Sequence, residues 1–132
     1  MKLLVKKRCA FRNPVLNNNK NKSIYNYYKI DEHKYSQCEV IERVHNGKRC
    51  FVLKSYNTYV ATVEEVKNNK WRFSCACTYS PTTRKHLGYF SKALFGENMY
   101  SVFKAVADDR NHGLIICDVK LLKNPRLIVK RY

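Results

Sequence analysis

Three aspartates and a lysine near the C-terminus are of the types that could hold a metal ion and cleave nucleic acid. Asp118 and Lys120 end an apolar run, and Asp108 and Asp109 lie ten and nine residues before Asp118. In a metal-dependent nuclease, carboxylates hold Mg²⁺ and a lysine supports the attacking water. Here Asp108 and Asp109 close a predicted helix, whereas Asp118 lies near the far end of the strand that follows. Strand residues at ~3.3 Å each put the groups ~10 Å or more apart, too far to share a metal, so we expect no cleavage.

The cysteines and histidines lack the spacing of a metal site or a catalytic triad. Among the six cysteines, Cys75 and Cys77 come closest to a zinc motif, with His86 nine residues later and no fourth ligand at a usual spacing. The four histidines have no carboxylate at an orienting offset, and the four glycines form no phosphate-binding loop. We therefore predict a protein that is not an enzyme, with reduced, partly buried thiols and with no metal, no cofactor and no small-molecule substrate.

The net charge is the strongest functional signal. The 132 residues include 26 Lys and Arg against 10 Asp and Glu, which gives a net charge of +16. Residues 1–30 hold eight basic residues and no acid, residues 31–70 hold seven against six, and residues 71–132 hold eleven against four. A codon bias towards lysine does not explain the shortage of acids. A nearly neutral middle between two basic ends predicts a folded body whose cationic surfaces bind a polyanion.

The basic residues between positions 67 and 96 indicate where that polyanion binds. This stretch holds six basic residues and no acid, and Arg84 and Lys85 follow directly on a predicted helix start. Exposed N–H groups and the helix dipole already favour an anion there, and Thr82 and Thr83 add hydroxyl donors. The alternative, that Arg84 and Lys85 only face solvent, is left open by the sequence. The predicted binding residues are Lys6, Lys7, Arg8, Arg72, Thr82, Thr83, Arg84, Lys85 and Lys92.

The elements that would position these residues begin with four strands in the middle of the chain. The strands are expected at residues 38–45, 48–56, 59–66 and 71–79, joined by turns at Asn46-Gly47, Asn57-Thr58 and Asn68-Asn69. Asn-Gly is the strongest short hairpin signal, because both turn positions need a positive φ. In the last strand, alternation places Trp71, Phe73, Cys75, Cys77 and Tyr79 on one face and Arg72 on the other. The pattern predicts a four-stranded antiparallel β-meander with one buried face.

Two helices are expected after the meander. Ser80-Pro81 is a capped helix start and Gly96 its end, and a second helix is expected from about residue 98 to residue 110. Their core stripes are Leu87, Phe90 and Leu94, then Met99, Val102, Phe103 and Val106. A short buried strand at 114–119 and, after Pro125, an edge strand at 127–129 complete the chain. The fold class is therefore α+β, a four-stranded antiparallel β-meander packed by two helices, with a C-terminal strand pair.

The first 30 residues are predicted to be a basic, Asn- and Tyr-rich arm ahead of a single α+β domain at residues 31–132. Within the arm, residues 13–23 read as a loop, and the Tyr-rich residues 24–30 as a short strand or a segment that stacks on unpaired bases. No apolar run of 18 residues exists, and Leu3, Leu4 and Val5 are too few for a signal peptide. We therefore expect no contact with a membrane and a cytoplasmic location.

Two stretches resemble a family of small, uncharacterised bacteriophage proteins. One is residues 53–61, with Ser55-Tyr56-Asn57-Thr58 at its centre, and the other is residues 78–87, followed by Phe90. The family is similar in having an SYNT-V-A strand and a YS-TT-SRH-I-FL helix start, and the likeness covers residues 53–94. This chain departs from it with Arg84-Lys85-His86 where Ser-Arg-His is usual. The resemblance implies a phage or prophage gene that acts in the cytoplasm of a bacterial host.

The charge and the resemblance together predict an accessory protein that binds nucleic acid, or a nucleic-acid-handling host complex, without catalysis. The sequence leaves DNA, RNA and protein open as partners. The alternative is an inhibitor of a host defence complex, of the anti-CRISPR kind, which would dock on a nucleoprotein or an acidic protein surface. A metal-dependent nuclease is the second alternative. A pull-down from host lysate with and without nuclease treatment would separate the first two, because only a protein partner survives the nuclease.

Overall fold

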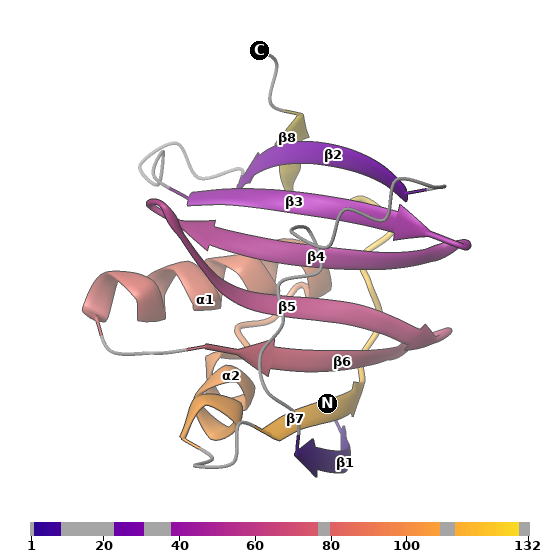
Figure 1. Cartoon of the computed structure of the whole chain (residues 1–132), viewed down its shortest axis with the longest axis vertical. Coiled ribbons are helices and arrows are strands. Elements are labelled where there is room, and N and C mark those ends of the chain that lie inside the picture. The colour runs from indigo at the N-terminus through magenta and orange to yellow at the C-terminus, as the bar shows by residue number, and fades with distance from the viewer. Residues whose placement is uncertain (1, 9–22, 31–37, 77–79, 109–112, 130–132) are drawn as a thin grey trace.

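One antiparallel sheet organises the molecule. The computed structural model describes residues 2–8, 23–30, 38–76, 80–108 and 113–129, and the strands among them form an eight-stranded sheet in the order β1-β7-β6-β5-β4-β3-β2-β8 (Figure 1). The strands are β1 (Lys2–Arg8), β2 (Ser23–Ile30), β3 (Cys38–His45), β4 (Lys48–Ser55), β5 (Thr58–Lys67), β6 (Lys70–Cys75), β7 (Gly113–Asp118) and β8 (Leu127–Val129). The α+β fold class predicted from the sequence is confirmed.

The strands β3 to β6 form the predicted meander, each paired with the next. Asn46 and Gly47 have φ of 53° and 76°, as the first hairpin requires. The second turn was expected at Asn57-Thr58, which is wrong by one residue. Ser55 pairs with Thr58, so Tyr56 and Asn57 make the turn and Tyr56 adopts a φ of 55°, unusual for a bulky side chain. The fourth strand ends at Cys75, and Cys77 and Tyr79 lie outside the described residues.

The two ends of the chain complete the sheet on both sides of the meander. The residues predicted as an arm contribute β1, which pairs with β7, and β2, which pairs with β3 and β8. The two C-terminal strands do not pair with each other. They lie far apart in the sheet, β7 between β1 and β6, and β8 at the opposite edge beside β2. An edge position suits β8, because it is only three residues long and short strands are usual at sheet edges.

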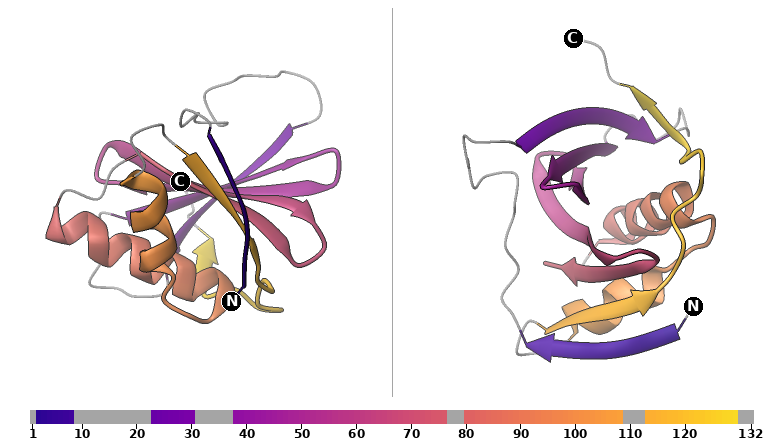
Figure 2. Two further views of the ribbon diagram at one scale, coloured as in Figure 1. Left: turned by 90° about the horizontal axis from the view of Figure 1, so that it is seen from below. Right: turned by 90° about the vertical axis from the view of Figure 1, so that its right-hand side faces the viewer.

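Two helices, α1 (Pro81–Phe95) and α2 (Tyr100–Ala107), pack on the same face of the sheet (Figure 2). The α1 ends are those predicted, since the N–H of Thr83 donates to Ser80 Oγ at 3.0 Å and Gly96 ends the helix with a φ of 80°. Helix α2 is shorter than the predicted 98–110, beginning at Tyr100 and ending at Ala107. No helix among these residues has both the length and the apolar character needed to cross a membrane.

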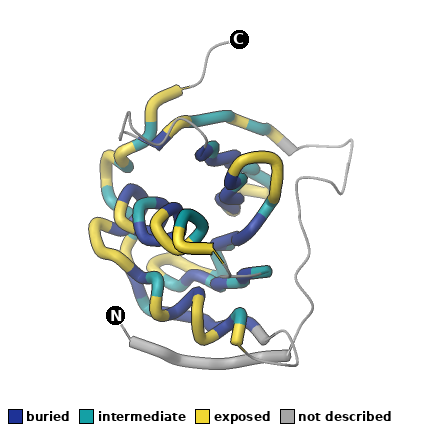
Figure 3. Tube along the Cα trace, turned by 90° about the vertical axis from the view of Figure 1, so that its left-hand side faces the viewer, coloured by how far each residue is buried: buried dark blue, intermediate teal, exposed yellow. Residues whose placement is uncertain are grey.

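The main core lies between this sheet face and the helices (Figure 3). The prediction of a single buried face is wrong, because Ile41, Cys50 and Val52 form a smaller buried cluster on the opposite face, where tyrosines of β2 and β5 pack against them. Trp71, Phe73 and Cys75 point into it, as the alternation predicted, and every residue of the two predicted helix stripes is buried. Phe73 is in contact with both helices, with ring centroids 5.7 Å from Phe95 and 5.2 Å from Phe103. The helices are thus held on the sheet by aromatic packing.

Candidate nucleic-acid interface

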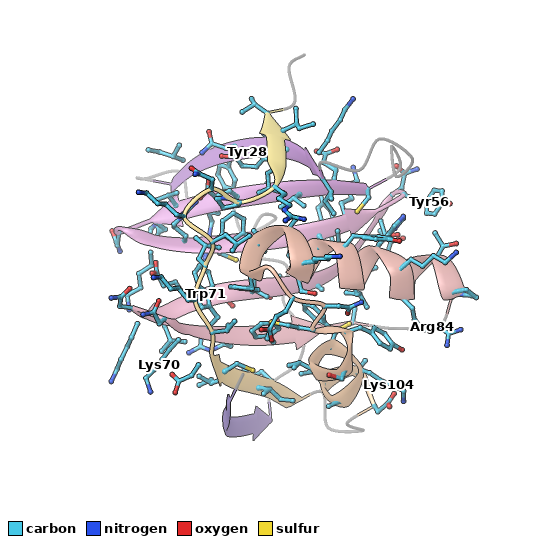
Figure 4. All side chains as sticks on the ribbon, turned by 180° about the vertical axis from the view of Figure 1, so that it is seen from behind. Tyr28, Tyr56, Lys70, Trp71, Arg84 and Lys104 are labelled. Atoms are coloured by element: carbon cyan, nitrogen blue, oxygen red, sulfur yellow. The ribbon has the colours of Figure 1, made fainter. Side chains whose placement is uncertain are left out.

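Helix α1 presents three cations on its outward face. Arg84 and Lys85 lie in its first turn and Lys92 in its last, and all three side chains are exposed (Figure 4 labels Arg84). Lys85 and Lys92 are seven residues apart, so they share one side of the helix at about 10 Å along its axis. Helix α1 contains no acidic residue, and none of the three cations makes an ion pair with another described residue. These predicted binding residues are therefore brought together.

Donor groups at the start of α1 are used in the N-cap of the helix itself. Ser80 Oγ accepts the N–H of Thr83, and the Ser80 hydroxyl donates to Thr83 Oγ1 at 2.9 Å. Thr82 and Thr83 are half-buried. The predicted phosphate site at this helix start therefore has fewer free donors than the sequence indicates, and the exposed Arg84 and Lys85 carry its charge.

The segment after β7 adds two cations beside the other end of α1. The Leu122 N–H donates to the Leu94 carbonyl at 2.7 Å, and the Arg126 N–H to the Ala93 carbonyl at 2.9 Å. Lys123 and Arg126 are both exposed. Residues 119–132 contain no acid, but no pattern in the sequence indicates that this stretch lies against α1. We refer to Arg84, Lys85, Lys92, Lys123 and Arg126 as the basic band.

Helix α2 has one lysine, Lys104, near the cations of α1, but its charge is paired. Lys104 is tied to the carboxylate of Asp108, four residues on, and this hydrogen bond raises the pKa of Lys104. The positive charge of Arg84 acts in the opposite direction on the same pKa, which shows that Arg84 and Lys104 lie near each other (Figure 4). The pair with Asp108 neutralises Lys104, so we leave it out of the basic band.

Arg72 lies on the other side of the molecule. It alternates with Trp71 and Phe73 along β6 and therefore points away from the helices, where it lines a pocket of about 350 Å³. Lys6, Lys7 and Arg8 lie in β1 at an edge of the sheet, in register with Ile115, Leu114 and Gly113 of β7. The predicted binding residues thus occupy at least two separate surfaces, α1 and the opposite sheet face. A sequence pattern of basic residues cannot separate these surfaces without the fold.

The aspartates considered for a nuclease site are held in different ion pairs. Asp108 pairs with Lys104 on α2, and Asp118 lies with its Oδ1 3.7 Å from Lys70 Nζ, between β7 and β6. Asp109 lies outside the described residues. Within the described ranges, no three His, Cys, Asp or Glu side chains converge as metal ligands. Burial raises the pKa of the Cys38 thiol to about 12 and that of Cys117 to about 11, so these thiols are poor nucleophiles at neutral pH.

Three residues from the stretches 53–61 and 78–87 meet beneath the start of α1. Ser55 Oγ and His86 Nδ1 are 2.6 Å apart, both side chains are buried, and the ring of Tyr56 lies 5.9 Å from that of His86. Sequence analysis found no special role for His86, because Ser55, its hydrogen-bond partner, lies 31 residues away along the chain. The pair joins the end of β4 to the first turns of α1. It is closed to solvent, which favours a structural role that holds the helix and its cations in place.

Burial lowers the pKa of His86, which makes the stability of the fold depend on pH. The unfolded chain binds a proton near pH 6.5, whereas the folded protein resists it, so the free energy of unfolding falls as the pH drops through 6.5. Between pH 7.5 and pH 5.5 we expect the free energy of unfolding to fall more in the wild type than in a variant without this histidine. Urea denaturation of the wild type and His86→Gln at both pH values measures it. An equal pH dependence in the two proteins would rule out this contribution.

Comparison with known proteins gives a family and no activity. A family model described as a family of unknown function (DUF8033) matches residues 13–103. No curated protein and no solved structure matches the chain. The matched region includes β2 to β6, α1 and the beginning of α2, and with them Arg72 and the α1 part of the basic band.

Proposed function

The chain belongs to this family of unknown function, DUF8033, and we propose from its surface that it binds nucleic acid through the basic band, without catalysis. The observation that carries the proposal is the outward face of α1. Arg84, Lys85 and Lys92 are exposed there on a helix without acids, and the segment after β7 adds Lys123 and Arg126. A protein that only needed solubility would intersperse both signs of charge on such a face.

The arrangement suits phosphates better than base edges. The cations are spread along about 10 Å of helix axis between Lys85 and Lys92, and a nucleic-acid strand presents a phosphate every ~3.4 Å of its helix axis. Long flexible side chains ~10 Å apart reach phosphates about three steps apart along a strand, and such contacts carry little sequence information. Weak sequence preference and strong salt dependence are therefore expected.

The proposal includes the origin of the gene and the cell in which the protein acts. The resemblance of residues 53–94 to small bacteriophage proteins favours a phage or prophage gene whose product acts in a bacterial cytoplasm. In that setting the partner is the nucleic acid itself or a host complex that handles it. An anti-defence inhibitor would use the same basic band on a nucleoprotein, and it differs from direct binding by a protein partner that survives nuclease treatment.

Neutralising the α1 cations tests the proposal. The variant Arg84→Gln/Lys85→Gln/Lys92→Gln should bind a 20-base-pair duplex at least tenfold more weakly than the wild type at 50 mM salt. Each lost phosphate contact also lowers the slope of log affinity against log salt by about 0.9, so the slope should fall by about 2.7. Fluorescence anisotropy over a salt series measures both quantities.

A second triple variant controls for net charge. Lys29→Gln/Lys54→Gln/Lys67→Gln removes the same three charges from β2, β4 and β5, away from α1. It should bind within about threefold of the wild type, because charges away from α1 make no contact with a duplex bound there and act only through a field that salt screens. Equal losses in the two variants would contradict binding by the band. A wild type that binds neither DNA nor RNA at 50 mM salt would overturn the proposed function.

A further inference from the structure

One row of side chains crosses the sheet on the face opposite the helices. The register aligns Tyr25, Arg43, Cys50, Glu64 and Arg72 on the neighbouring strands β2 to β6. Register partners in an antiparallel sheet project from the same face. The row therefore carries two guanidinium groups and a carboxylate side by side, with the small Cys50 between them.

A pocket of about 350 Å³ lies over this row, near the β3–β4 turn. Its polar lining includes Arg43, Lys48 and Arg72 as cations, with Glu64 and Glu65 as carboxylates. Its volume is within the range of pockets that hold small ligands. A basic residue of each of the strands β3, β4 and β6 therefore faces one hollow.

Two buried polar atoms of this row, Arg72 Nε and Tyr25 Oη, have no hydrogen-bond partner among the residues that the structure describes. Arg72 lies directly opposite Glu64, yet no ion pair joins these two described residues. Buried donors of folded proteins are almost always paired, and exceptions call for an explanation such as an absent ligand. Arg72 thus lines the pocket with a guanidinium group whose Nε the described part of the fold leaves unpaired.

The other cations of the lining are engaged to different degrees. Arg49 Nε donates a hydrogen bond to Glu42 Oε2 at 2.6 Å, so the Arg49 guanidinium is ion-paired with that carboxylate. Lys48 Nζ donates to the Val66 carbonyl at 2.8 Å, which uses one of its three donors. Lys48 and Arg72 therefore have donors left for an anion in the pocket. Glu64 offers acceptors next to them.

We propose that this pocket binds the phosphomonoester group of a nucleotide, with Arg72 and Lys48 on the phosphate and Glu64 on a hydroxyl or amino group of the attached nucleoside. A guanidinium fork fits two phosphate oxygens, and a phosphomonoester carries nearly two negative charges at pH 7, against one for an internal phosphodiester. A bare phosphate would fill only a small part of the volume. A carboxylate in the lining would repel it, whereas sugar hydroxyls or base amino groups satisfy Glu64.

The phosphomonoester can come from a free nucleotide or from the phosphorylated end of a strand, and calorimetric titration separates the two sources. The probes are adenosine 5′-monophosphate, adenosine, and a ten-nucleotide oligothymidylate with and without a 5′-phosphate. We expect adenosine 5′-monophosphate to bind and adenosine not to bind. We expect the 5′-phosphate to raise the affinity of the oligonucleotide at least tenfold if strand ends also enter the pocket. Either gain supports the proposal, and the absence of both overturns it.

Arg72→Met should abolish these phosphate-dependent gains, and Arg72→Lys, which keeps the charge but loses the fork, should weaken them at least threefold. The matched control is Lys70→Met, which removes a charge from the same face of β6 outside the pocket and should leave them unchanged. If Arg72→Met does not fold, the Arg72→Lys titration decides, and gains equal to the wild type would refute the assignment.

The pocket and the basic band lie on opposite faces of the sheet, so the two proposals fail separately. The triple α1 variant should retain the phosphate-dependent gains while losing affinity for the duplex. Binding of adenosine 5′-monophosphate without any duplex binding would reject the proposed function and leave the pocket assignment standing. Duplex binding without any phosphate-dependent gain would reject the pocket alone.

Discussion

Replacing Phe73 by alanine should lower the free energy of unfolding by about 4 kcal/mol. Phe73 is fully buried, and its ring lies 5.7 Å from Phe95 of α1 and 5.2 Å from Phe103 of α2. The change removes apolar contact area and leaves a cavity that the packed helices cannot close, a combination that costs ~3–5 kcal/mol in protein cores. Since small domains are stable by only ~5–15 kcal/mol, the variant should retain little stability. Urea denaturation followed by circular dichroism measures the change.

An exposed apolar residue supplies the control for this prediction. Ile128 on β8 is 51% exposed, and its replacement by alanine should change the free energy of unfolding by less than about 0.5 kcal/mol. A loss below about 1.5 kcal/mol in Phe73→Ala would show that the sheet and the helices do not depend on this aromatic contact. The position of the basic band on α1 would then need another explanation.

The meander and α1 could be predicted because their signals are local. Asn46 and Gly47 accept positive φ, and Ser80 and Gly96 cap a helix, whatever the rest of the chain does. Alternation of large apolar residues in β6 identified the buried face correctly. The misplaced turn at Tyr56 shows the limit of such signals. A bulky residue such as Tyr56 prefers a negative φ, so its φ of 55° is imposed by the pairing of β4 with β5, which sets the position of the turn.

The outer strands of the sheet could not be placed from the sequence. Strand β2 pairs with β8 about a hundred residues later, and β1 pairs with β7 across a similar separation. An apolar run shows that a segment is buried, but it does not name the strand with which it pairs. For this reason the N-terminal residues read as an arm, and the two C-terminal strands as a pair.

Of the two candidate sites, one could be predicted from local sequence patterns and the other depends on strand pairing. The α1 cations were found because helical spacing and the absence of acids are visible in sequence. The pocket depends on the registers of four strands, which bring Arg43, Cys50, Glu64 and Arg72 into one row. Of these residues, the sequence singled out only Arg72 for binding. Backbone hydrogen bonds from Leu122 and Arg126 hold the segment with Lys123 against α1, and no sequence pattern predicts these bonds.

The buried carboxylate of Glu42 should make Arg49→Met the second most costly change. Glu42 accepts hydrogen bonds from Arg49 Nε at 2.6 Å, Tyr28 Oη at 2.9 Å and Asn26 Nδ2 at 3.3 Å, and its side chain is only 5% exposed. Without the guanidinium, two neutral donors remain for a buried charge. Removing one partner of a fully buried ion pair costs ~3–5 kcal/mol. Because the Arg49 side chain is 38% exposed, we expect a smaller loss of about 2–3 kcal/mol. Urea denaturation at pH 7 measures the loss.

The double variant Glu42→Gln/Arg49→Met tests the cause of that loss. Glutamine still accepts from Tyr28 and Asn26 but carries no charge, so the double variant should be more stable than Arg49→Met by at least about 1 kcal/mol. The exposed pair of Lys104 and Asp108 is the control, since both side chains are 55% exposed and Lys104→Met should leave the midpoint of urea denaturation nearly unchanged. A double variant no more stable than Arg49→Met would mean that packing of the Arg49 chain over Phe51, and not the stranded charge, holds β2, β3 and β4 together here.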